Sequence, residues 1–231
     1  MKGNKTMLGL SLREEFRSRR LKGTAIELTN DNDTGATQLP AADFLEITYP
    51  STDLLKAIEA IGPEQARPVV VMGERGQGKS HLIAALHHVL TDSSQTKSWL
   101  RAWSQRLTRS NIETLPLRSG MLVISESLHR QRYKFLWDLI FERHPHGAFI
   151  RGKWEGQGEK KTDIPPDTLL LELLRHQPTA LILDEFQTWY DGLVNSPQQP
   201  YKNWAFNFIQ VLYDWHTKIW ILSLQEVWDK G

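Results

Sequence analysis

The stretch that decides the fold, residues 69–86, reads VVVMGERGQGKSHLIAAL. It begins with apolar residues, passes through three glycines and continues into a segment rich in Ala and Leu. The spacing GxxxxGKS, from Gly73 to Ser80, is typical of a loop whose backbone N–H groups turn inward around a phosphate. The pattern therefore predicts a buried strand at 69–72, a phosphate-binding loop and a helix directly after it.

Two polar side chains of this loop have roles that the pattern specifies. We expect Lys79 to reach the β- and γ-phosphate oxygens of a nucleotide, and the hydroxyl of Ser80 to be a ligand of Mg²⁺, which prefers oxygen. The glycines leave space for phosphates to approach the backbone. The predicted nucleotide-binding residues are Gly73, Glu74, Arg75, Gly76, Gln77, Gly78, Lys79, Ser80 and His81.

A second stretch, TALILDE at residues 179–185, is the expected partner of this loop. It is an apolar strand that ends in two carboxylates. Many buried strands end in acidic residues, so this pattern is informative only because the phosphate-loop pattern accompanies it. We expect Asp184 to hold Mg²⁺ through a water molecule and Glu185 to orient the attacking water. Lys79 and Glu185 are thus the candidate catalytic residues, and Ser80 and Asp184 the candidate metal ligands.

Further strand and helix patterns surround these two motifs. Apolar runs indicate strands, and apolar residues spaced by three and four indicate helices. About a hundred residues separate the motifs, which leaves room for a doubly wound parallel sheet with ligands at the carboxyl ends of its strands. The predicted strands are 44–50, 121–127 and 218–225; the predicted helices are 134–144, 167–176 and one that a residue of 51–53 caps and Gly62 stops.

Three residues outside the main motifs are weaker candidates. Ser223 or Gln225, at the end of the stretch 218–225, is a candidate reader of the γ-phosphate. Tyr49 precedes the phosphate-loop strand and is a candidate contact of adenine, with core packing as the competing interpretation.

Composition places the chain among ordinary globular proteins. Its 231 residues are 40% hydrophobic, which is enough for a sizeable core. No apolar stretch is long enough to cross a bilayer, and the N-terminus lacks the apolar segment of a signal peptide. The chain has no cysteine, which excludes disulfides and thiolate metal sites and is compatible with a reducing cytoplasm. We therefore expect a cytoplasmic protein without membrane contact.

The formal net charge of +1 gives no global attraction to nucleic acid, but local basic segments remain. Residues 1–22 contain seven lysines and arginines against two glutamates, a balance that indicates a solvated face, a partner contact or a phosphate contact. The cluster HRQRYKF at 129–135 follows a predicted strand without an acidic neighbour. The segment 150–167 is predicted to be a long loop whose charges cancel. His144 and His146 are poor zinc candidates because no cysteine or carboxylate cluster accompanies them.

Five stretches carry a resemblance to a known family. They are LREEFRSRRLKGTAIELTNDNDTGATQLPAADFLEITYP, VVVMGERGQGKSHL, GMLVISESLHRQRYKFLWDLIFERHPHG, KWEGQGEKKTDIP and LILDEFQTWYDGL. Together they resemble the N-terminal part of a family of large bacterial ATPases, catalogued as a domain of unknown function. Its members sit beside DNA methyltransferase genes in anti-phage islands and are similar to the ATPase components of BREX-type defence systems. The resemblance implies an AAA+-like P-loop fold, ATP as the nucleotide and a part in restricting foreign DNA.

The chain also departs from that family. Family members continue for hundreds of residues, whereas this chain ends at Gly231, after the expected fourth strand. An AAA+ sheet normally has a fifth strand, an arginine finger and a helical lid. We therefore expect a basic extension and polar loop at 1–40, followed at 41–231 by an ATPase core that lacks the final strand and lid. Such a chain would bind ATP and turn it over slowly, unless Arg130 or Arg132 of a neighbouring copy supplies the finger.

Three functions are compatible with these features. The leading expectation is an ATP-binding and hydrolysing motor or switch subunit of a defence system, assembled as a homo-oligomer or with other subunits such as a DNA methyltransferase. DNA would be contacted directly or through those partners. The alternatives are a helicase or translocase, because DEFQ resembles the acidic box of such enzymes, and a nucleotide-gated scaffold without turnover.

Overall fold

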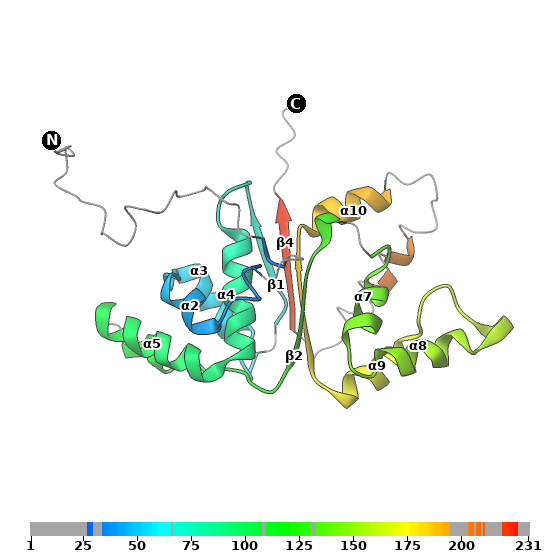
Figure 1. The fold of residues 1–231 in the computed structure, drawn as a ribbon, viewed down its shortest axis with the longest axis horizontal. Helices are drawn as coiled ribbons and strands as arrows, with labels where there is room; N and C mark the ends of the chain where they lie inside the picture. Colours follow the sequence, from blue (N-terminus) through cyan, green and yellow to red (C-terminus); the bar gives the residue numbers. More distant parts are fainter. Residues whose placement is uncertain are drawn as a thin grey trace, which may run out of the picture.

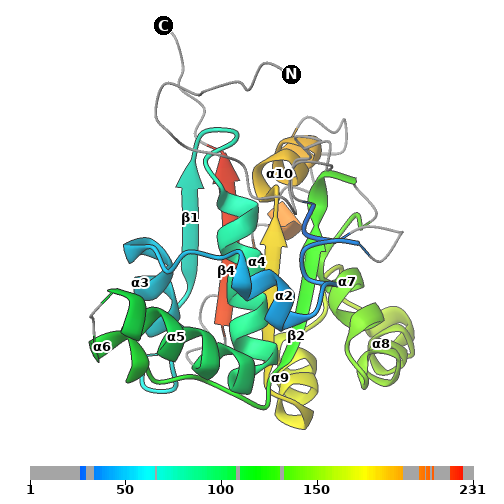
Figure 2. The ribbon, with the colours of Figure 1, turned by 60° about the vertical axis from the view of Figure 1, so that its left-hand side comes forward.

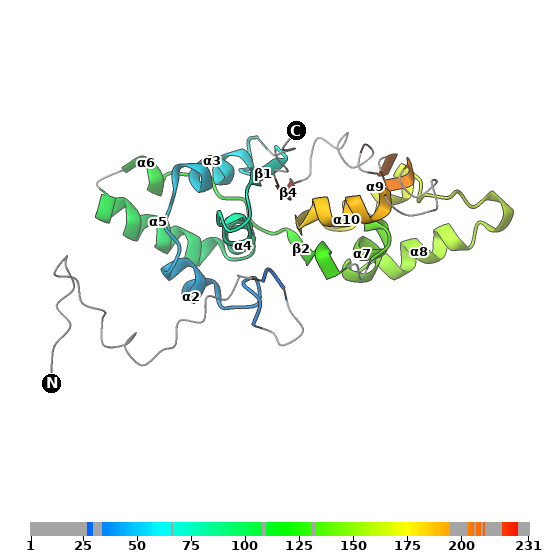
Figure 3. The ribbon, with the colours of Figure 1, turned by 90° about the horizontal axis from the view of Figure 1, so that it is seen from above.

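A four-stranded parallel sheet lies at the centre of the molecule (Figure 1). The computed structural model describes residues 27–29, 34–65, 67–107, 110–130, 133–194, 203–205, 207–208, 210 and 219–225. Helices cover both faces of the sheet in this part of the chain (Figure 3). The predicted α/β class with a mainly parallel sheet is therefore confirmed. The strands are β1 (Val69–Gly73), β2 (Leu122–Ser127), β3 (Thr179–Asp184) and β4 (Ile219–Gln225).

The last strand in the sequence, β4, lies between β1 and β3, so that the strand order is β1-β4-β3-β2. Gly73 pairs with Gln225, and Leu183 pairs with Leu222. On the other side of β3, Ser127 pairs with Asp184. Because all four strands are parallel, their carboxyl ends meet at one edge of the sheet, which we call the carboxyl edge. The predicted strands at 121–127, 179–185 and 218–225 are confirmed to within one residue at each end.

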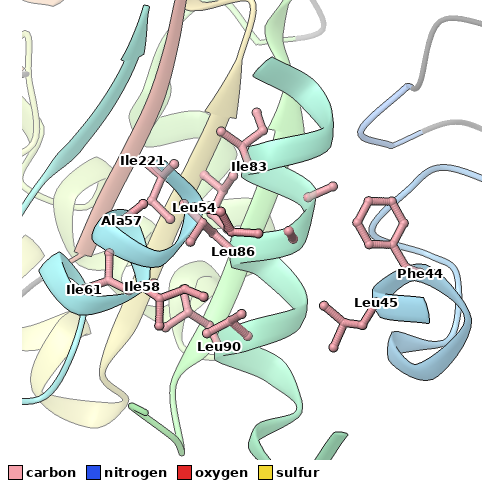
Figure 4. Close-up of a cluster of buried hydrophobic side chains, with 14 of the residues drawn as sticks. Phe44, Leu45, Leu54, Ala57, Ile58, Ile61, Ile83, Leu86, Leu90 and Ile221 are labelled. Atoms are coloured by element: carbon pink, nitrogen blue, oxygen red, sulfur yellow. The ribbon is translucent and has the colours of Figure 1, made fainter. Parts of the chain in front are cut away.

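One face of the sheet is covered by α4 (Lys79–Thr91), which is itself covered by further helices (Figure 2). Ile83, Ala84, Ala85 and Leu86 of α4 are all fully buried. Figure 4 shows Ile83 and Leu86 close to Ile221 of β4, with Leu54 of α3 beside them. The apolar residues of α4 therefore form the centre of this core. The surrounding helices are α2 (Ala41–Glu46), α3 (Thr52–Ala60), α5 (Ser93–Leu107) and α6 (Ser110–Glu113).

The opposite face carries a second core rich in aromatic rings. Trp137 stacks on Phe135 with ring centroids 4.1 Å apart and meets Phe208 edge-on at 5.2 Å. Leu170 and Leu173 of α9 are fully buried in the same cluster. The predicted helices at 134–144 and 167–176 are confirmed. The elements on this side are η1 (Leu128–Arg130), α7 (Leu136–Arg143), α8 (Gly147–Glu155), η2 (Gly158–Lys160), α9 (Asp167–His176) and α10 (Phe186–Val194).

Two predictions of local structure are wrong. The stretch 44–50 was expected to be a strand, but residues 41–46 form α2. The adjacent Phe44 and Leu45 are both buried, which a helix lying between α4 and α5 permits and a half-exposed strand would not. The stretch 150–167 was expected to be a loop, but α8 extends to Glu155. Ile150 and Trp154, four residues apart, share the buried face of that helix.

The described part of residues 27–38 packs around α4, although the sequence analysis set residues 1–40 apart from the core. Leu28 and Ala36 are buried in the cluster around α4. The Nε2 atom of His88 lies 2.7 Å from the carbonyl oxygen of Ala36, which joins this segment to α4. Some residues before 41 thus contribute to the hydrophobic core.

The neighbouring His87 joins α4 to β2. Its Nδ1 atom lies 2.8 Å from Ser125 Oγ. Burial, assisted by the nearby His88, lowers the pKa of His87 to about 4. The folded state therefore holds this imidazole neutral under conditions where the unfolded chain would protonate it.

We expect Leu86→Ala to destabilise the protein by about 2–5 kcal/mol, because the substitution leaves a cavity between α4 and the sheet. Urea unfolding at neutral pH measures the loss. Ile47→Ala is the control, since Ile47 is 70% exposed, and should change the free energy of unfolding by less than about 0.5 kcal/mol. A loss below about 1 kcal/mol for Leu86→Ala would contradict the central place given to α4.

We also expect the free energy of unfolding to fall as the pH is lowered from about 6.5 to about 4. In this window the unfolded chain binds more protons at His87 than the folded chain does, so acid favours unfolding by up to about 3 kcal/mol. His87→Asn keeps a polar atom near Ser125 and removes the titrating group. Its stability should depend less steeply on pH in this window, and identical slopes for the two proteins would refute the assignment.

Candidate functional site

The candidate site lies at the carboxyl edge of the sheet. The glycine-rich loop, residues 74–78, connects β1 to α4, and Asp184 and Glu185 connect β3 to α10. Figures 1 and 2 both show this loop and the start of α10 at the same edge. The fold thus brings together the two motifs that the sequence analysis paired.

The glycine-rich loop has a backbone that requires glycine at two positions. Gly76 has φ +85° and Gly78 has φ +81°, values that residues with a Cβ rarely adopt. Helix α4 begins directly after Gly78, at Lys79. The N–H groups of the first helical turn therefore open toward the loop, where an anion would be favoured.

Gln77 contacts the residues that begin this loop. Its Oε1 atom accepts a hydrogen bond from the backbone N–H of Glu74 at 3.1 Å. A Cβ on Gly73 would lie only 2.5 Å from that oxygen. Glycine at position 73 therefore leaves the space that the Gln77 side chain fills. The sequence pattern identified Gln77 only as a member of the loop and did not indicate this contact.

The ammonium group of Lys79 folds over the start of the loop. Its Nζ atom donates to the carbonyl oxygens of Gly73 and Glu74, both at 2.9 Å. A lysine has three N–H donors, so these two bonds leave one for an anion in the loop. Ser80, the next residue of α4, is half-buried. Arg75 is exposed.

His81 is the predicted loop residue whose side chain is engaged elsewhere. Its Nε2 atom lies 3.0 Å from Thr48 Oγ1, and its ring lies 4.7 Å from that of Phe44. Burial lowers the pKa of His81. The imidazole therefore joins α4 to α2 and to the segment after it.

A cavity of about 510 Å³ adjoins the glycine-rich loop. Ala57, Val71 and Leu82 give it apolar walls, and Asp53 and Lys56 give it charged groups. Tyr49 does not line it. The ring of Tyr49 is 58% exposed and lies edge-on against Trp103 of α5 at 5.2 Å, so the core-packing interpretation is wrong and the adenine contact stays a prediction.

The two carboxylates differ in burial. Asp184 is 3% exposed, and its Oδ1 atom accepts a hydrogen bond from the N–H of Glu185 at 2.9 Å. Glu185 is partly exposed and has φ +55°, the only positive value of a non-glycine residue in the described part of the chain. Such a backbone is strained, and strained residues concentrate at functional sites. The sequence predicted the carboxylates but gave no indication of this conformation.

The carboxyl end of β2 lies beside Asp184. Ser127, its register partner, is buried, and its Oγ atom lies 2.8 Å from His129 Nδ1. The polar end of β2 therefore lies at the same edge as the acidic pair. Of the cluster 129–135, Lys134 Nζ lies over the ring of Phe135 at 5.6 Å from its centroid. Arg132 and the side chain of Arg130 lie outside the described residues.

Two of the weaker candidates lie on β4. Gln225 is the last residue of this strand, and its backbone pairs with that of Gly73. The side chains of Ser223 and Gln225 lie outside the described part of the chain. His144 is buried, whereas His146 stacks on His176 with ring centroids 4.2 Å apart. Within the described part, no group of three or more His, Cys, Asp or Glu side chains is arranged to hold a metal ion.

Comparison of the sequence with models of known protein families and with curated proteins finds no match. Across the described ranges, no helix has the length and apolar character needed to span a membrane. Function has to be inferred from the residues and the geometry of the site.

Proposed function

We propose that this protein is an AAA+-like P-loop ATPase that binds ATP with Mg²⁺ at the carboxyl edge and hydrolyses its terminal phosphate. One observation carries the proposal. A loop with left-handed glycines, covered by the Lys79 ammonium group, begins α4 at the same edge where a buried Asp184 and a strained Glu185 end β3. The loop suits a polyphosphate and the acidic pair suits Mg²⁺ and water.

The strand order gives these two motifs a suitable separation. One strand, β4, lies between β1 and β3. Two strand spacings are about 10 Å, which leaves room for the terminal phosphates, a metal ion and a water molecule between the loop and the acids. Direct pairing of β1 with β3 would halve that distance.

The residues present fit Mg²⁺. This ion usually takes one or two protein oxygens and completes its shell with water and phosphate oxygens, so it does not need a cluster of three acidic or imidazole groups. The hydroxyl of Ser80 and the carboxylate of Asp184, the latter through water, would hold it. When bound, Mg²⁺ neutralises charge that develops on the phosphate oxygens.

Lys79 and Glu185 would carry out the binding of the phosphates and the activation of water. Lys79 directs its remaining N–H donor at the β- and γ-phosphate oxygens. Glu185 accepts a hydrogen bond, and then a proton, from the water that attacks the γ-phosphorus, as the bond from that phosphorus to the β,γ-bridging oxygen breaks. ADP leaves with the electron pair of that bond, and inorganic phosphate is the second product.

The cavity beside the loop is the proposed place for the nucleoside. Its volume of about 510 Å³ lies within the range of small-molecule pockets, and both apolar and charged residues line it. Gly78 and Lys79 belong both to its lining and to the loop. A base in the cavity would therefore be continuous with phosphates in the loop.

The wider role follows from the resemblance described above. We propose a motor or switch subunit of a bacterial anti-phage system that acts in the cytoplasm, as a homo-oligomer or with partner subunits such as a DNA methyltransferase. DNA would be reached directly or through those partners. ATP turnover that rises with protein concentration or on addition of double-stranded DNA would support this role, and turnover indifferent to both would count against it.

Lys79→Ala should weaken binding of Mg-ATP by about one to two orders of magnitude, because it removes a charge-assisted hydrogen bond worth about 1.5–3 kcal/mol. Calorimetric titration measures the dissociation constant. Lys97→Ala, which removes an exposed lysine of α5, is the matched control and should bind normally. Unchanged affinity in Lys79→Ala would remove the proposed phosphate site.

Glu185→Gln should retain ATP affinity and lose most of the hydrolysis, because an amide keeps the shape of the side chain but is a poor proton acceptor. Phosphate release in a single-turnover assay, with protein in excess, measures the rate even when turnover is slow. Asp184→Asn should instead raise the Mg²⁺ concentration needed for half-maximal hydrolysis, because it removes a charge that holds the metal ion. Equal, measurable rates for the wild-type and Glu185→Gln proteins would contradict the role of Glu185. ATP binding without any hydrolysis by the wild-type protein would instead favour the nucleotide-gated scaffold.

A further inference from the structure

Thr188, on the first turn of α10, contacts the carboxylate to which the proposed function assigns the attacking water. Its Oγ1 atom donates a hydrogen bond to Glu185 Oε2 at 3.2 Å. This contact engages one carboxylate oxygen and restricts rotation of the group. The direction of the second oxygen, Oε1, is restricted as a result.

The turn that carries Thr188 is fixed by its neighbours. Trp189 is 3% exposed, and its Nε1 atom donates to the carbonyl oxygen of Tyr133 at 3.0 Å. Phe186 is also buried and packs on Trp189, with ring centroids 5.4 Å apart. The helix that carries the Thr188 hydroxyl is therefore anchored in the second core. A group that positions another side chain has to stand on such a fixed element.

The backbone of Glu185 is fixed as well. The Asp184 carboxylate accepts its N–H, and the carbonyl oxygen of Glu185 accepts from the N–H of Trp189 at 3.4 Å. Ordering a long glutamate side chain costs considerable rotamer entropy. A donor that holds the carboxylate before the reaction would reduce this cost.

We infer that Thr188 is a positioning residue of the ATPase site. Its hydroxyl holds the Glu185 carboxylate in the orientation that the attacking water requires. The inference rests on the proposed function, because it assigns Thr188 a role only through Glu185. The competing explanation is purely structural: the same hydrogen bond would stabilise the start of α10 and have no effect on hydrolysis beyond its effect on folding.

Three variants separate these explanations. Thr188→Val has a similar shape and removes the hydroxyl, whereas Thr188→Ser retains it. Thr91→Val is the matched control, because the Thr91 hydroxyl also bonds within its own helix, to the carbonyl oxygen of His87 at 2.9 Å, far along α4 from the loop. Single-turnover hydrolysis, the dissociation constant of Mg-ATP and the midpoint of thermal unfolding are measured for each.

We expect Thr188→Val to slow single-turnover hydrolysis about tenfold, the effect of losing one hydrogen bond to a charged group, with the dissociation constant unchanged. Thr188→Ser should recover the rate to within about threefold of wild type, and Thr91→Val should match wild type. In a Glu185→Gln background, Thr188→Val should cause little further loss, because both changes act on one group.

Several results would overturn the inference. A rate for Thr188→Val within about twofold of wild type excludes a positioning role. Equal loss in the wild-type and Glu185→Gln backgrounds, or a loss that follows the thermal midpoint and is not recovered by serine, assigns the hydrogen bond to folding alone. If Glu185→Gln abolishes hydrolysis while Thr188→Val keeps a rate within about twofold of wild type, only this inference fails. If Glu185→Gln has no effect, the proposed role of Glu185 fails and the inference fails with it.

Discussion

The parallel pairing of β4 with both β1 and β3 is the constraint on which the candidate site depends. It aligns the end of β1, where the glycine-rich loop begins, with the end of β3, where the acidic pair stands. Without β4 the two strands would have no common register. The last described strand in the sequence thus determines how two motifs face each other that lie about 140 and about 40 residues earlier in the chain.

Helix α4 makes that edge rigid. It is packed against the sheet on one side and against α2 and α3 on the other, so its first turn cannot shift without disturbing a buried core. His81, His87 and His88 bond to three different neighbours along its length. The glycine-rich loop is therefore held between two packed elements, β1 and α4.

The sequence predicted most of the sheet and the composition of the site, because both depend on local patterns. Apolar runs defined the strands, and the spacing of Gly73, Gly78 and Lys79 defined the loop. It did not predict α2, because two adjacent apolar residues, Phe44 and Leu45, do not distinguish a helix from a strand. It did not predict the length of α8, because Ile150 and Trp154 alone mark the buried face at its end. It also did not predict the contact of Gln77 with Glu74, the strain at Glu185 or the hydrogen bond from Thr188. These depend on side-chain directions that residue types alone do not specify.

The left-handed backbone at Glu185 has a consequence for how this corner of the chain tolerates change. A residue with a Cβ costs about 1–2 kcal/mol in that conformation, and glycine would adopt it without strain. Glu185→Gly would therefore relieve the strain and stabilise the protein, but it would remove the carboxylate. Selection for thermal stability alone would be expected to remove Glu185, so engineering of this chain for stability should leave the residue fixed.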